Sequence, residues 1–130
     1  MLLIAGRNTS AMPPTPADIK LRTKHFAVRV INMTESLPGR PAARVISNQI
    51  LRSATSVGAN YHSACKARSH AEFIAKMGVV AEEADETVFW LELLVEAGLV
   101  KAKRMESLLK EANELVAIFF ASQVTARARR

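Results

Sequence analysis

The sequence predicts an all-α fold, an antiparallel up-down-up-down four-helix bundle. Apolar residues recur at alternating steps of three and four, helix start and stop signals divide the chain into four segments, and the connections between the segments are short. Of the 130 residues, 49% are hydrophobic and 5% are aromatic, which suits one core of closely packed helices. We expect a bundle domain over residues 15–126, preceded by a flexible leader (1–14) and followed by a basic tail (127–130).

The first predicted helix begins at Thr15, whose hydroxyl can cap it, with Pro16 at the first helical position and Asp18 in the first turn. Pro38 and Pro41 separate this helix from the second, because a residue before proline disfavours helical geometry whereas proline suits a helix start. The apolar stripe of the first helix consists of Ile19, Phe26, Val30, Met33 and Leu37.

The second predicted helix spans about residues 41–67 and is rich in small side chains. Around Gly58 these side chains let a neighbouring helix come close, so the glycine is tolerated despite a cost of about 1 kcal/mol. Cys65 is the only cysteine, and we expect it to be a small buried residue. The core-facing positions are Ile46, Ile50, Ser53 or Ala54, Val57 and Tyr61.

A capping box formed by Ser69 and Glu72 predicts the start of the third helix. Gly98 suits a left-handed C-cap, after which a fourth helix ends near Thr125. The core stripe of the third helix is Phe73, Met77, Val80, Ala84, Thr87 or Val88, Leu91, and Leu94 or Val95. That of the fourth helix is Met105, Leu108, Ala112, Leu115 and Phe119.

The last two helices carry more apolar residues than one core-facing stripe requires. Further apolar surface on a bundle helix indicates a second buried face, and we therefore expect a homo-oligomer. These additional residues are Leu109, Val116 and Phe120 in the fourth helix and Ile74, Phe89, Trp90 and Leu93 in the third.

The net charge of +6 is distributed unevenly along the chain. Residues 1–80 contain eleven Lys and Arg against three Asp and Glu, whereas residues 81–120 contain four against nine. Such polarity either attracts nucleic acid or lets basic and acidic helices meet across interfaces. The apolar run near the N-terminus, residues 2–5, is far shorter than a membrane span or a signal peptide core. We expect a cytoplasmic protein that does not contact a membrane.

Several spaced motifs resemble those of a known family. They are NQILRSA (48–54), SVGAN (56–60), Arg68 and Ser69 before Glu72, and EEADE (82–86) followed by WLELL (90–94). Over roughly residues 17–121 the chain is similar to four helix bundle proteins that include those encoded in the intervening sequences of bacterial 23S ribosomal RNA genes. After Asn60 many members have a small apolar residue and Glu-Gly, whereas this chain has YHSAC (61–65), which indicates a variant branch.

The resemblance implies a four-helix protomer that assembles as a ring-shaped pentamer. It also implies a distant likeness to the accessory proteins of diversity-generating retroelements, which are thought to bind nucleic acid alongside a reverse transcriptase. No established activity comes with the family itself.

Two polar residues of the second helix are predicted to have structural roles. Arg52 lies beside the core positions Ile50 and Ser53, and a desolvated arginine requires a carboxylate. We expect Arg52 to pair with Glu83 or Glu86 and thereby fix the register of two helices. Asn60 is predicted to be a buried polar residue that specifies helix packing.

Basic residues of the first two helices are candidate contacts to the phosphates of RNA or DNA. Because aromatic residues for base stacking are few, such binding would be directed to the backbone and sensitive to salt. The alternative is an ordinary solvated basic face on a structural or protein-interaction scaffold. The candidates are Lys20, Arg22, Lys24, Arg29, Arg40, Arg44, Lys66 and Arg68.

Motifs for catalysis are missing from the sequence. The acidic cluster at 82–86 could hold a di-metal centre only with Glu-x-x-His pairs, and no Glu has His three residues later. His25, His62 and His70 lack metal-ligand spacing, and there is no phosphate-binding glycine loop, nucleophile elbow or paired-cysteine motif. We expect a protein that is not an enzyme, with no catalytic residues, no metal and no other cofactor, and we identify no small-molecule substrate.

Overall fold

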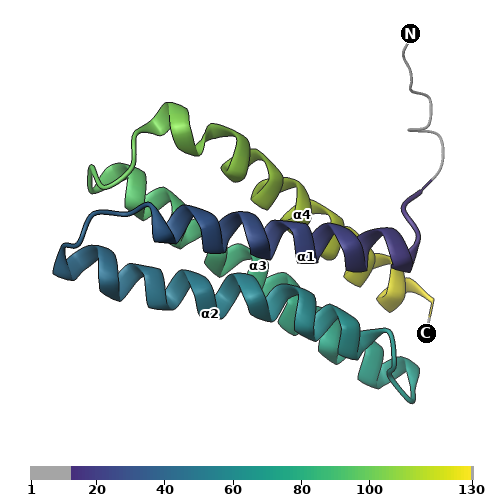
Figure 1. Cartoon of the computed structure of the whole chain (residues 1–130). Helices are drawn as coiled ribbons and strands as arrows, with labels where there is room; N and C mark the ends of the chain where they lie inside the picture. Colours follow the sequence, from purple (N-terminus) through teal and green to yellow (C-terminus); the bar gives the residue numbers. More distant parts are fainter. Residues whose placement is uncertain (1–12, 130) are drawn as a thin grey trace, which may run out of the picture.

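A computed structural model describes residues 13–129, in which there are four α-helices and no strands. They are α1 (Pro16–Glu35), α2 (Pro41–Ala64), α3 (His70–Glu96) and α4 (Ala102–Ala128), which lie along one another (Figure 1). The all-helical prediction is confirmed for this part of the chain. Most of the predicted leader lies outside the described residues, and its last two residues, Pro13 and Pro14, are exposed and not helical.

The predicted signals at the helix ends act as hydrogen-bonding groups. Thr15 Oγ1 accepts from the Asp18 amide at 3.1 Å while the Asp18 carboxylate accepts from the Thr15 amide at 2.9 Å, which lowers the pKa of Asp18. Ser69 Oγ accepts from the Glu72 amide, but the Glu72 carboxylate accepts from the amide of Arg68 instead of Ser69. Gly98 has φ of 74° and ends α3 in a Schellman turn, in which the Leu99 amide donates to the Leu94 carbonyl.

Two helix ends differ from the prediction. α2 ends at Ala64, because the next amides, of Lys66 and Ala67, bond carbonyls three residues back. The predicted burial of Cys65 is therefore wrong: the residue lies at the helix end beyond the core and is exposed. α4 continues to Ala128, so Arg127 belongs to its last turn and not to a tail. No glycine or proline interrupts residues 121–128, and alanine and arginine favour helix.

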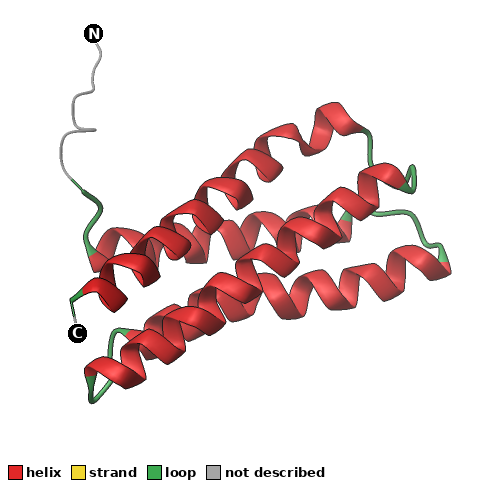
Figure 2. Cartoon of the chain, turned by 180° about the vertical axis from the view of Figure 1, so that it is seen from behind, coloured by secondary structure: helices red, strands yellow, loops and turns green. Residues whose placement is uncertain are grey.

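The connections lie at the two ends of the bundle (Figure 2), and the start of α1 and the end of α4 share one end (Figure 1). Lys76 Nζ donates to Ser63 Oγ at 2.7 Å and Thr87 Oγ1 donates to Ser53 Oγ at 2.8 Å, so residue numbers rise in α2 as they fall in α3. These features are compatible with the predicted antiparallel arrangement. α2 and α4 both pack closely on α3, whereas α1 packs on α2 and touches α4 much less.

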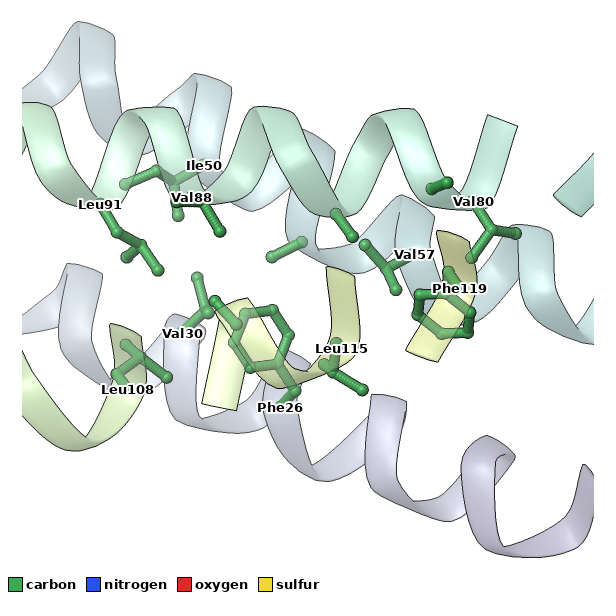
Figure 3. Close-up of a cluster of buried hydrophobic side chains, with 14 of the residues drawn as sticks. Phe26, Val30, Ile50, Val57, Val80, Val88, Leu91, Leu108, Leu115 and Phe119 are labelled. Carbon is green, nitrogen blue, oxygen red and sulfur yellow. The ribbon is translucent and has the colours of Figure 1, made fainter. Parts of the chain in front are cut away.

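All four helices contribute to one apolar core. In Figure 3, Phe26 of α1, Val57 of α2, Leu91 of α3 and Leu115 of α4 are among the side chains gathered between the helices. The predicted core stripes are buried, except that Met33, Leu37, Phe73 and Val95, near helix ends, are only partly buried.

The apolar residues beyond the core stripes differ in exposure. Phe89 and Phe120 are 55% and 45% exposed, whereas the others predicted for this second face are partly buried. These others are Ile74, Trp90, Leu93, Leu109 and Val116.

The small residues of α2 allow α1 to approach, as the sequence predicts. A Cβ atom on Gly58 would lie 3.2 Å from Thr23 Oγ1 and 3.4 Å from Thr23 Cβ. Thr23 is 1% exposed, and its hydroxyl donates to the Lys20 carbonyl at 3.0 Å. A Cβ at position 58 would therefore require Thr23 to shift by a few tenths of an ångström.

Candidate nucleic-acid interface

The α1/α2 seam brings together three of the eight predicted phosphate contacts. Lys20 and Lys24, one helical turn apart, line an open groove of about 760 Å³ with His62 of α2. The positive charges of Lys20, Lys66 and Lys24 lower the pKa of His62, which places all four cationic or ionisable groups near one another. We call this cluster (Lys20, Lys24, His62 and Lys66) the basic groove.

The walls of the basic groove suit an anionic chain. No carboxylate lines it among the described residues, and its floor includes the small residues Ala27, Gly58 and Ala59. None of its three lysines forms an ion pair within residues 13–129. Its positive charge therefore faces solvent without internal compensation.

Arg22 is not available in the same way. Its Nε and Nη2 donate to the two carboxylate oxygens of Glu111 at 2.7 Å each, and Nη2 also donates to Glu114 at 2.7 Å. These hydrogen bonds to Glu111 and Glu114 raise the pKa of Arg22. Two carboxylates of α4 thus occupy its Nε and Nη2, and a phosphate would have to compete with them for these donors.

The remaining predicted contacts lie away from the basic groove, apart from Arg68 in the turn after α2. Arg29 faces α4, where its Nη2 donates to Ser107 Oγ at 2.9 Å. Arg40 is the residue before α2 and Arg44 lies in its first turns, so along the helix axis they are about 36 Å and about 30 Å from Ala64, at the end of α2 next to Lys66. His62, in contrast, was missed as a member of the site, although its spacing of four residues from Lys66 could have placed it there.

A second polar cluster connects α2 and α3. Arg52 donates to Glu83 at 3.1 Å and also to Glu86, so the predicted pairing is present with both carboxylates. Trp90 Nε1 donates to Glu86 at 2.9 Å, and the hydrogen bonds from Trp90 and Arg52 lower the pKa of Glu86. The Arg52 side chain is 47% exposed, so the assumption that Arg52 is desolvated, on which the prediction was based, is wrong. Its role in fixing register stays a prediction.

The family model of the 23S rRNA-intervening sequence protein matches residues 17–121. The chain belongs to this family. A crystal structure of a protein with unknown function from the S23 ribosomal protein family of Bacteroides thetaiotaomicron is 36% identical, with a TM-score of 0.75. The match covers 81% of this chain and 97% of that one. None of the curated proteins compared with the chain matches it significantly.

Asn60 directly precedes the segment (61–65) in which this member of the 23S rRNA-intervening sequence family departs from the common pattern. Asn60 is only partly buried, and its Nδ2 donates to the Ser56 carbonyl of its own helix at 2.8 Å. The prediction that Asn60 is a buried packing residue is wrong, because the neighbouring Tyr61 occupies the core-facing position. Tyr61 packs on Phe119 with ring centroids 5.6 Å apart, and burial raises the pKa of its hydroxyl.

Residues 13–129 contain no group of three or more His, Cys, Asp or Glu side chains placed to hold a metal ion. No helix within the same range is long and apolar enough to cross a membrane. The acidic cluster of α3 instead supplies two carboxylates, Glu83 and Glu86, to Arg52.

Proposed function

We propose that this protein is a non-enzymatic, oligomeric bundle of antiparallel up-down helices that binds the phosphate backbone of RNA or DNA through the basic groove. The observation that supports the proposal is that Lys20 and Lys24 line a groove whose described lining contains no carboxylate, with Lys66 close enough to lower the pKa of His62 in the same lining. Lysine ammonium groups bind phosphates as point charges, and such contacts carry no sequence information.

The composition of the groove determines the kind of binding we propose. Its described lining contains no Phe, Tyr or Trp, and the His62 imidazole is its only aromatic ring, so base stacking is limited and sequence preference is weak. Three lysines that each neutralise a phosphate give a salt dependence with a slope of about −2 in log K against log salt for a single strand. In an oligomer the grooves repeat, and simultaneous contacts to one strand raise the overall affinity.

The test is fluorescence anisotropy with a labelled single-stranded RNA and a labelled DNA duplex over a series of salt concentrations. The double variant Lys20→Gln/Lys24→Gln removes two adjacent charges, and we expect it to reduce the salt slope by about 1.4 for the single strand. Arg40→Gln/Arg44→Gln is the matched control, because it removes two exposed charges at the far end of α2. Equal losses in both double variants, or no binding of wild type at low salt, would contradict the proposal.

Apolar exposure favours a second candidate function, a scaffold whose role is assembly alone. Phe89 and Phe120 are large, exposed and located on α3 and α4, where a second face was expected, while Arg22 and Arg52 are neutralised by carboxylates of the same chain. Large apolar side chains exposed on a helix face are candidates for such an interaction site.

Light scattering distinguishes the oligomeric states. We propose the pentamer that the family resemblance implies, with Phe120→Ser lowering the mass and Val45→Ser, an exposed residue of α2, leaving it unchanged. A monomeric wild type would overturn the assembly proposal for both candidate functions. A pentamer that binds no nucleic acid would leave the scaffold.

A further inference from the structure

A pocket of about 370 Å³ lies between the end of α1 and the start of α4. Figure 1 shows these segments at the end of the bundle opposite to the described chain termini, away from the basic groove. α1 and α4 make the least contact of the neighbouring helices. The pocket is thus a result of their incomplete packing, and its volume is in the range of small-ligand sites.

Each of the two helices contributes an arginine to the pocket: Arg29 from α1 and Arg104 from α4. Neither arginine forms an ion pair with any described residue, and no carboxylate is among the described lining residues. The hydrogen bond from Arg29 Nη2 to Ser107 Oγ, at 2.9 Å, orients the guanidinium across the seam. It uses one of five N–H donors and leaves the others for a ligand.

Besides the arginines and the polar residues Asn32, Ser36 and Ser107, the pocket is lined by apolar side chains. They include Met33 of α1, Leu37 just after α1, and Leu108 of α4, which is only 6% exposed. α4 also begins at this pocket without a side-chain cap, since its N-cap residue Lys101 makes no such hydrogen bond. Free amide groups at a helix start add to the positive potential beside the arginines.

We propose that this pocket binds a small organic anion, whose phosphate or carboxylate head contacts Arg29 and Arg104 and whose apolar body packs on the floor. Guanidinium groups donate paired hydrogen bonds that match the oxygen spacing of both kinds of head. The apolar floor distinguishes an aryl or alkyl anion from an inorganic one, because only the former buries carbon surface. The pocket is independent of the basic groove and of nucleic-acid binding there.

The experiment titrates the full chain with phenyl phosphate, benzoate, inorganic phosphate and benzyl alcohol, followed by heteronuclear NMR. We expect saturable shifts of pocket amides with phenyl phosphate or benzoate, at a dissociation constant below about 1 mM, and at least tenfold weaker binding of inorganic phosphate and of benzyl alcohol. Arg29→Gln and Arg104→Gln should each weaken the aryl anion by about tenfold, since each removes a charge-assisted hydrogen bond. Arg44→Gln, an exposed arginine of α2, is the matched control.

Three results would overturn the proposal. Equal affinity for inorganic phosphate and phenyl phosphate would show an adventitious anion only. Unchanged binding in both arginine variants would show that the head group lies elsewhere. An absence of saturable shifts at the pocket in the folded wild type would show that Arg29 and Arg104 do not bind an anion.

Discussion

Replacing Gly58 with alanine sets two opposing effects against each other at the contact between α1 and α2. Glycine within a helix is about 1 kcal/mol less favourable than alanine, so helix propensity alone would stabilise the variant. The new Cβ, however, would lie 3.2 Å from Thr23 Oγ1. The sign of the measured change therefore reports how closely the two helices approach.

Thr23 has little room to yield. It is 1% exposed, its side chain is branched at Cβ, and its hydroxyl donates to the Lys20 carbonyl. Overpacking of this kind costs about 1–3 kcal/mol, which exceeds or equals the propensity gain. We therefore expect Gly58→Ala to lower the free energy of unfolding by about 0–2 kcal/mol.

The same substitution in a Thr23→Ala background should change sign. Without the hydroxyl, the nearest remaining side-chain atom is Cβ at 3.4 Å, an ordinary contact, and the gain of about 1 kcal/mol in helix propensity then dominates. Urea unfolding, followed by circular dichroism at one protein concentration, measures the stability of the wild type, the two single variants and the double variant, which form a double-mutant cycle. Gly39→Ala, with nothing within 4 Å of its Cβ, is the control for loss of unfolded-state entropy. A Gly58→Ala gain of equal size in both backgrounds would refute the close approach.

Three further predictions concern charged groups. Arg52→Met should lower the free energy of unfolding only slightly, because the ion pair is largely exposed. Urea unfolding that shows unchanged stability, together with unchanged assembly, would contradict a role in register. Hydrogen bonds lower the pKa of Glu86 from 4.5, so its contribution to stability is complete above pH 4.5 and is lost as the pH falls through the lower folded value. Glu86→Gln should flatten the acid limb of a stability-against-pH curve, and an unaltered limb would contradict the Trp90 and Arg52 contacts. The lysines lower the pKa of His62 from 6.5, so the folded state resists its protonation and stability decreases as the pH falls below 6.5. Lys66→Gln should raise the pKa of His62 in an NMR titration. An unchanged pKa would show that Lys66 is too far from His62 to belong to the basic groove.

The elements that were predictable from the sequence are those that depend on local signals. Thr15 and Ser69 cap helices through their own hydroxyls, and Gly98 ends α3 because its φ is positive, so the neighbouring residues suffice to place them. Core positions follow from spacing alone, as with Ile50 and Leu91. The pairing of Arg52 was also predictable, because Glu83 and Glu86 lie about one turn apart on the adjoining helix and both can reach it.

The missed features depend on how separate helices meet. The burial of Cys65 was misjudged because a shift of three residues in the end of α2 moves it from helix to turn. The bonds from Arg22 to Glu111 and from Arg29 to Ser107 join residues more than seventy positions apart, and their existence depends on the relative shift of α1 and α4. The pocket at that seam arises from the same shift, and no local pattern encodes it.

The sparse contact between α1 and α4 also bears on how the bundle opens. α2, α3 and α4 form a continuous packed set, whereas α1 is attached along α2 and held to α4 by few groups, chiefly Arg22 and Arg29. The smallest cooperative opening is then the release of α1 alone, so amide hydrogens of α1 exchange with solvent before those of α3. An opening of this kind would uncover Phe26 and the side chains it covers, and it would break the ion pairs of Arg22 with Glu111 and Glu114.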